Sequence, residues 1–132
     1  MSDCCATKDV MLLACSGGSN VGQIANDAAK ALDQLGQGRM YCAVGVGAQL
    51  PSFVEAAKKA ATLVAIDGCE VACVKKGLEK AGITPQVYVV ATELGIEKGH
   101  HFNYTRDEVA EVAGAAAKAL QGGGCCCQGE KE

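Results

Sequence analysis

Short apolar runs alternate with stretches of helical periodicity along this chain. Four apolar or alternating runs predict strands at residues 10–14, 39–46, 62–66 and 86–91. Four stretches with apolar residues every three or four positions predict helices at residues 21–35, 51–60, 67–81 and 109–120. This alternation is typical of a three-layer α/β domain, in which a four-stranded, mainly parallel sheet carries helices on both faces. Right-handed crossovers restrict the topology, and we expect the flavodoxin-like strand order 2-1-3-4.

Polar residues mark where three of these helices begin. In a capping pair, two polar side chains three positions apart bond to each other's backbone. The sequence offers such pairs at Asn20 and Gln23, Asp67 and Glu70, and Thr105 and Glu108. A helix that opens at Asp67 would carry Cys69 in its first turn and Cys73 one turn later, on the same face.

The length and composition fit a single domain. The 132 residues are 49% hydrophobic but only 4% aromatic, so the core must be mainly aliphatic. We expect one α/β metal-binding domain at residues 9–121, a flexible lead-in at residues 1–8 and a flexible, cysteine-rich tail at residues 122–132.

The charge excludes several classes of partner. A net charge of −3 leaves no electrostatic surface for nucleic acid or an anionic membrane. No apolar segment approaches the roughly 20 residues of a membrane span, and the N-terminus is unlike a signal peptide. We therefore expect a cytoplasmic protein with a metal ion, and neither nucleic acid nor membrane, as its partner.

Nine cysteines are many for such a chain. Because intracellular thiols are kept reduced, a metal or redox site is favoured over a disulfide scaffold. Ligands of open α/β sheets bind at the carboxyl ends of the strands. The cysteines that follow or end the first three strands should meet at that edge: Cys15, Cys42, Cys69 and Cys73.

Four thiolates around one centre are the usual ligands of structural zinc, and they also suit an iron–sulfur cluster, which we consider second. The spacing differs from paired Cys-x-x-Cys knuckles, so spacing alone is a weak signal. The alternative is that Cys15 and Cys42 are simply small buried apolar residues.

Two motifs carry a family resemblance. The Asp67-Gly68-Cys69 triplet with Cys73, together with the segment 15–23 around Cys15, resembles the DGC-domain family of zinc-binding proteins, over roughly residues 10–112. The resemblance implies a zinc site formed by Cys15, Cys42, Cys69 and Cys73. It implies no defined biochemical role.

The loop after Cys15 invites two other readings. It lacks the arginine that a cysteine phosphatase needs six residues after its nucleophile, because Val21 stands there. Backbone N–H groups at the start of the next helix still favour a small anion. The candidate anion-binding residues are Ser16, Gly17, Gly18 and Ser19.

Two alternatives to a static zinc site remain, and a pair of histidines has an open role. Cys69 or Cys15 could act as the nucleophile of a thiol-based redox or sulfur-transfer enzyme. The Cys4-Cys5 and Cys125-Cys126-Cys127 clusters could make the protein a sensor or carrier of soft metals. His100 and His101 follow the fourth strand and could add a ligand or a proton donor.

Overall fold

The computed structural model describes residues 9–122 and contains a sheet of four parallel strands. The strands lie in the order β2-β1-β3-β4. Their bounds are Val10–Ala14 for β1, Arg39–Met40 for β2, Thr62–Asp67 for β3 and Val87–Val90 for β4. In the register, Leu12 of β1 lies beside Met40 of β2 and Val64 of β3. The predicted fold class and strand order are confirmed.

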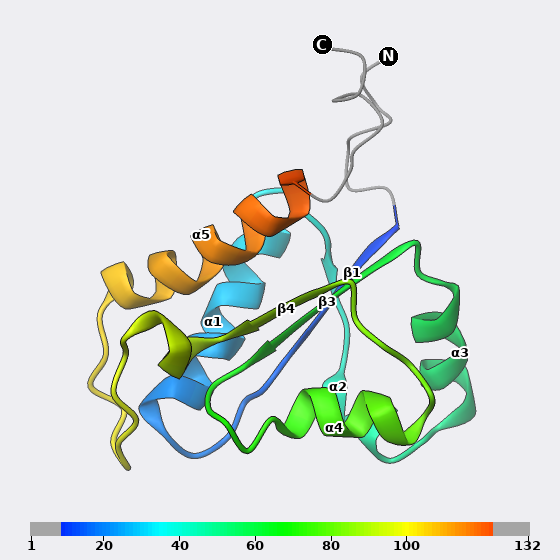
Figure 1. Cartoon of the computed structure of the whole chain (residues 1–132), viewed down its shortest axis with the longest axis horizontal. Coiled ribbons are helices and arrows are strands. Elements are labelled where there is room, and N and C mark those ends of the chain that lie inside the picture. The colour runs from blue at the N-terminus through cyan, green and yellow to red at the C-terminus, as the bar shows by residue number, and fades with distance from the viewer. Residues whose placement is uncertain (1–8, 123–132) are drawn as a thin grey trace, which may run out of the picture.

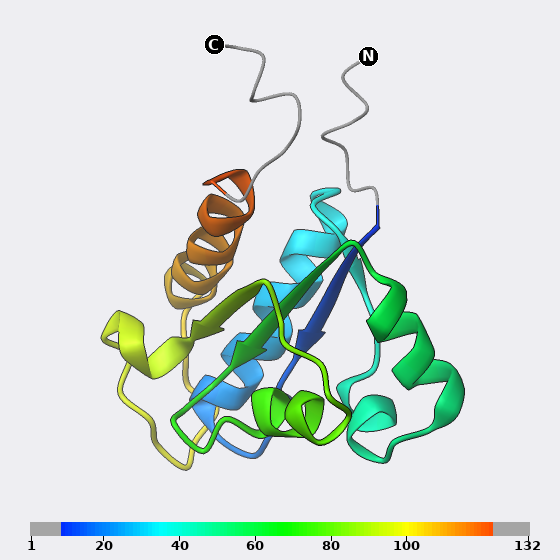
Figure 2. The ribbon, with the colours of Figure 1, turned by 45° about the vertical axis from the view of Figure 1, so that its right-hand side comes forward.

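Helices cover both faces of the sheet, so the domain has three layers (Figures 1 and 2). One face carries α1 (Asn20–Gln34) and α5 (Arg106–Gly122). The other carries α2 (Ala43–Gly47), α3 (Pro51–Lys59) and α4 (Cys73–Lys80). A short 3-10 helix, η2 (Ala91–Leu94), follows β4.

Alternation along the strands divides the core into two halves. Leu12, Val64 and Ile66 point to the α1 and α5 side, where they pack with Ile24 and Val112. Their neighbours along the two strands point to the α2, α3 and α4 side. There they form a second cluster with residues of these helices and of the segment after α4. The strand members are Met11, Leu13, Leu63 and Ala65, and the others are Val46, Ala57, Val74, Leu78 and Ile83. A sheet buried on both faces explains why the strands read as continuous apolar runs.

The second predicted strand is much shorter than residues 39–46. Pairing with β1 ends at Met40, after which only the Tyr41 N–H donates to the Leu12 carbonyl, at 2.9 Å. The chain then turns into α2, where Gly45 packs directly against the ring of Phe53. A side chain at residue 45 would collide with Phe53 of α3, so glycine allows α2 to pack this closely. Cys42 lies immediately before α2 instead of inside a strand.

The helix after β3 begins at Cys73, so the prediction that it opens at Asp67 is wrong. Residues 68–72 form a turn that ends at Ala72, whose φ of 56° is left-handed. Cys69 therefore lies in this turn and not in a helical turn. The predicted pair of Asn20 and Gln23 is also wrong, because Ser19 caps α1 by accepting from the Gly22 N–H. Thr105 and Glu108 do form the predicted reciprocal pair.

Gly68 allows the turn after β3 to lie directly on the start of α1. A Cβ atom at Gly68 would lie 2.7 Å from the Val21 carbonyl carbon and 2.8 Å from the Gly22 nitrogen. Both of these are backbone atoms, which cannot move without shifting the helix. Glycine is required here because of this close approach, and its conformational freedom plays no part.

We predict that Gly68→Ala lowers the free energy of unfolding by about 1–3 kcal/mol, the usual cost of an extra methyl group in a packed interior. Gly114→Ala is the matched control, because Gly114 lies in α5 with no atom within 4 Å of an added Cβ. The control should be neutral or stabilising, since alanine favours a helix. Urea unfolding of both variants measures the difference, and equal stabilities would contradict the close approach.

Candidate functional site

The loops that follow β1 and β3, together with α2 and α4, gather at the carboxyl edge of the sheet (Figures 1 and 2). The start of β1 and the end of α5 lie at the opposite edge. The cysteine clusters near the two termini lie outside the described residues, so the carrier hypothesis that involves them stays a prediction.

Asp67, at the end of β3, fixes the start of α4. Its carboxylate is only 1% exposed and accepts hydrogen bonds from the Val74 N–H at 2.9 Å and the Lys75 N–H at 3.1 Å. The Tyr88 hydroxyl donates to the same carboxylate at 2.9 Å. Three donors satisfy the buried charge, which would otherwise be costly. Asp67 thus caps the helix from seven residues away, and it fixes the position of Cys73, the first residue of α4.

Tyr88 is the residue of this network that sequence reasoning missed. It lies on β4 in an otherwise apolar strand, and the Lys75 ammonium lies 5.1 Å from the centre of its ring. Burial, followed by the hydrogen bond to Asp67, raises the pKa of the Tyr88 hydroxyl well above its usual range. The hydroxyl therefore stays protonated and remains a donor. A tyrosine between valines was the available signal.

Three of the four predicted metal ligands line one cavity. Cys15 after β1, Cys42 before α2 and Cys73 at the start of α4 all contribute to the walls of a hollow of about 540 Å³. Cys42 and Cys73 are exposed, and Cys15 is half-buried. The predicted convergence at the carboxyl edge therefore holds for these three residues as neighbours of one cavity.

Burial favours the protonated form of the Cys15 thiol. Removal from water raises the pKa of its thiol, and nearby Asp67 and Cys73 add to the shift, although backbone N–H groups of Gly17 and Gly68 oppose it. The Gly17 N–H lies 3.3 Å from the sulfur. At neutral pH Cys15 is consequently a thiol, which must lose its proton before it can bind a metal.

Cys69 does not line this cavity. Its sulfur accepts a hydrogen bond from the Lys98 ammonium nitrogen at 3.4 Å, a contact that no pattern in the sequence predicts. Asn20 holds the segment that carries Lys98, because its side chain donates to the Glu97 carbonyl at 2.9 Å and accepts from the Gly99 N–H at 2.7 Å. The start of α1 therefore fixes a lysine against Cys69.

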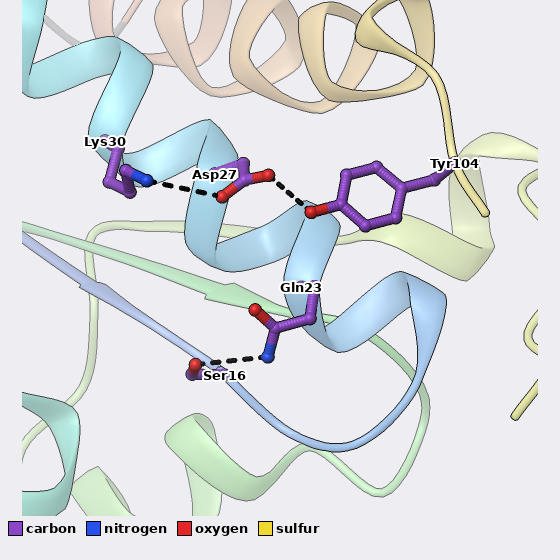
Figure 3. Close-up of polar contacts among 5 residues, drawn as sticks. All are labelled: Ser16, Gln23, Asp27, Lys30 and Tyr104. Atoms are coloured by element: carbon purple, nitrogen blue, oxygen red, sulfur yellow. Dashed lines mark hydrogen bonds and ion pairs between the residues drawn. The ribbon is translucent and has the colours of Figure 1, made fainter. Parts of the chain in front are cut away.

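The Ser16–Ser19 loop lies beside a second hollow, of about 420 Å³, which Gln23, Phe102 and Tyr104 also line. Gln23 Nε2 donates to the Ser16 hydroxyl at 3.3 Å and to the Gly17 carbonyl at 3.0 Å, which closes the loop against α1 (Figure 3).

On the next turn of α1, the Tyr104 hydroxyl donates to Asp27 at 2.6 Å, and Asp27 also pairs with Lys30 at 3.7 Å (Figure 3). These contacts are internal to the fold. Anion binding by the loop stays a prediction.

No described group of three or more histidine, cysteine or acidic side chains is already placed to hold a metal ion. His100 and His101 are both exposed, and neither lines the cavity with the three cysteines. His101 Nδ1 accepts instead from the Asn103 N–H at 3.0 Å. Within residues 9–122, no helix has the length and apolarity needed to cross a bilayer.

Similarity to known proteins identifies the family of this chain. A model of the DGC domain matches residues 11–116, which is most of the chain. This chain belongs to the DGC domain family. It is also 39% identical over 88 residues to the anaerobic and virulence modulator AnvM of Pseudomonas aeruginosa, and the match covers 67% of each chain. No solved structure matches this DGC domain.

Each residue of the Asp-Gly-Cys triplet, one of the motifs that carry the family resemblance, has a physical role in the structure. Asp67 caps α4, Gly68 makes room for the backbone of α1, and Cys69 meets Lys98. The triplet is thus a joint between β3, α1 and α4, which also places Cys73 beside the cavity.

We predict that Tyr88→Phe lowers the free energy of unfolding by about 1 kcal/mol at neutral pH, because Asp67 loses one donor. Because the pKa of Tyr88 is raised in the folded protein, the difference in free energy of unfolding between wild type and Tyr88→Phe depends on pH. The stabilisation is complete below the usual tyrosine pKa of about 10 and is lost as the pH rises through the higher folded value.

The gap between wild type and Tyr88→Phe should therefore shrink above about pH 10, and urea unfolding at neutral and alkaline pH measures it. Tyr41→Phe is the control, since Tyr41 is exposed and makes no described side-chain hydrogen bond. A gap that stays constant or widens with pH would show that the Tyr88 hydroxyl does not support Asp67.

Proposed function

We propose that this DGC domain binds a soft metal ion, with zinc as the expected metal and Cys15, Cys42, Cys69 and Cys73 as its ligands. The observation that carries the proposal is that cysteines from three separate segments line one cavity at the carboxyl edge. Membership of the DGC family supports a metal-binding role in general. The relative AnvM is an anaerobic and virulence modulator, a description that specifies no ligand.

The donor types fit a soft metal. No carboxylate or imidazole lines the cavity, and thiolates are the ligands that favour zinc and iron–sulfur clusters over magnesium or calcium. The arrangement requires movement, because the sulfurs are not already grouped for coordination. Cys42 and Cys73 are exposed and free to turn toward Cys15, whereas Cys69 must first leave Lys98. Cys69 is therefore the ligand whose recruitment costs most.

The number of cysteines recruited decides what the metal does. With four thiolates the zinc is closed off and contributes to the stability of the domain, whereas three thiolates leave one position open to an outside ligand. The cavity supports Cys15, Cys42 and Cys73 as the core set and Cys69 as the fourth member. An iron–sulfur cluster is the second possibility, and it would colour the protein.

We predict that the reduced full-length protein binds about one equivalent of zinc at the domain, in addition to any metal held by the terminal cysteines. Elemental analysis after desalting should show one equivalent fewer for Cys73→Ser than for wild type. If three thiols are enough to hold the metal, Cys69→Ser should lose less zinc than Cys73→Ser. Ser16→Ala, beside Cys15 but without a sulfur, is the control and should retain the metal. Unchanged metal content in a Cys15→Ser, Cys42→Ser and Cys73→Ser triple variant would refute the site.

A second function, thiol chemistry at Cys69, is favoured by the Lys98 contact. The Lys98 ammonium is placed to donate a hydrogen bond to a thiolate at Cys69, and the thiolate is the reactive form of a cysteine. Cys69 lies apart from the three cavity cysteines and next to this lysine. Cys15 is the poorer candidate nucleophile, because burial raises the pKa of its thiol.

We predict that iodoacetamide modifies Cys69 faster than Cys15 at neutral pH, and that Lys98→Met slows the modification of Cys69 several-fold. Lys76→Met, on the exposed side of α4, is the matched control and should leave the rate unchanged. Peptide mapping by mass spectrometry follows each thiol separately. A Cys69 rate that is insensitive to Lys98→Met would remove the support for thiol chemistry.

A further inference from the structure

The cavity beside the three cysteines is far larger than a metal ion. It lies among the end of β1, the start of α1, the segment after β2, and helices α2 and α4, and encloses about 540 Å³. Pockets for small molecules typically measure about 300–1,000 Å³. Its walls carry the thiols of Cys15, Cys42 and Cys73 and the polar side chains of Ser16, Asn26 and Tyr41. The other lining residues are glycines and apolar residues, and no lining residue is an Asp, Glu, Lys, Arg or His.

We infer that this cavity is a binding site for a small, uncharged and mainly apolar molecule. Apart from the thiols proposed to bind a metal ion, the walls offer no charged group to an ionic ligand, which is costly to remove from water. The lysines of α4 do not line the cavity. Lys76 and Lys80 line a neighbouring hollow that shares only Gly47 and Gly77 with this cavity. Lys75 lies over the ring of Tyr88. Apolar walls with a few polar groups, here the thiols and the side chains of Ser16, Asn26 and Tyr41, are typical of sites for neutral ligands.

The fold leaves this cavity open for a structural reason. β2 ends at Met40, so the last residues of β1 have no strand beside them on that side. The short helix α2 stands where the strand would have continued, and it leaves Val44 77% exposed and Tyr41 39% exposed at the rim. When an apolar molecule covers an apolar rim, apolar surface is removed from water and the free energy falls.

The inference does not depend on metal binding. The three thiols form only part of the wall, and the other lining groups, such as Val46 and Leu78, are aliphatic. Loss of metal from a cysteine variant would therefore leave the apolar part of the site intact. Conversely, a variant that fills the cavity tests the ligand site without removing a sulfur.

The test uses the reduced full-length protein after treatment with a chelator, and 1-aminoanthracene as an uncharged fluorescent probe. We expect saturable binding at one site per chain, with the anionic 1-anthracenesulfonate binding much more weakly. Gly77→Leu fills the cavity from α4, where an added Cβ meets the Gly47 Cα at an ordinary 3.6 Å. It should abolish binding of the uncharged probe. Gly114→Leu, the same change in open space on α5, should retain it.

A second pair of variants avoids any change in helix packing. Val44→Asp places a charge at the exposed rim and should weaken binding of the probe several-fold, whereas Val71→Asp, exposed but outside the cavity, should not. The inference is overturned if the uncharged probe shows no saturable binding. It is also overturned if Val44→Asp and Val71→Asp bind the probe equally, or if the anionic probe binds as tightly as the uncharged one.

Discussion

The buried carboxylate of Asp67 is the interaction on which the candidate site depends. It ends β3 inside the domain and receives hydrogen bonds from two backbone N–H groups of α4 and from Tyr88 on β4. One side chain thereby joins two neighbouring strands and a helix that begins six residues later. The glycine that follows lets this joint lie against the backbone of α1. Loss of either residue would move the start of α4, and Cys73 with it.

The same joint explains how a short chain places four cysteines on one edge with different surroundings. Cys15, Cys42 and Cys73 each lie at the end or start of an element that meets the cavity. Cys69 lies inside the turn and faces a lysine. The edge therefore holds three thiols around one cavity and a fourth thiol against an ammonium group. The proposed four-thiolate site requires Cys69 to exchange its contact with Lys98 for the metal.

The sequence predicted the sheet well because a strand buried on both faces is a continuous apolar run, and right-handed crossovers leave few orders for such strands. It failed where a distant contact overrides the local pattern. Alternation past Met40 resembled a strand, but residues 43–47 form α2, which packs through Gly45 against Phe53 of α3. Asp67 and Glu70 resembled a local cap, yet Asp67 bonds to residues seven and eight positions on. Tyr88 reaches Asp67 from the neighbouring strand and Lys98 reaches Cys69 from the segment after η2, so their spacing from Asp67 and Cys69 in the sequence does not predict either contact.

X-ray absorption at the zinc edge tests the central claim most directly, on protein in which the five terminal cysteines outside residues 9–122 are replaced by serine. That protein keeps only the four cysteines of the domain. We expect the metal to have at least three sulfur neighbours at about 2.3 Å, the usual zinc–thiolate distance. A zinc ion surrounded mainly by nitrogen and oxygen, or no bound zinc in the folded protein, would contradict a shared thiol site at the carboxyl edge.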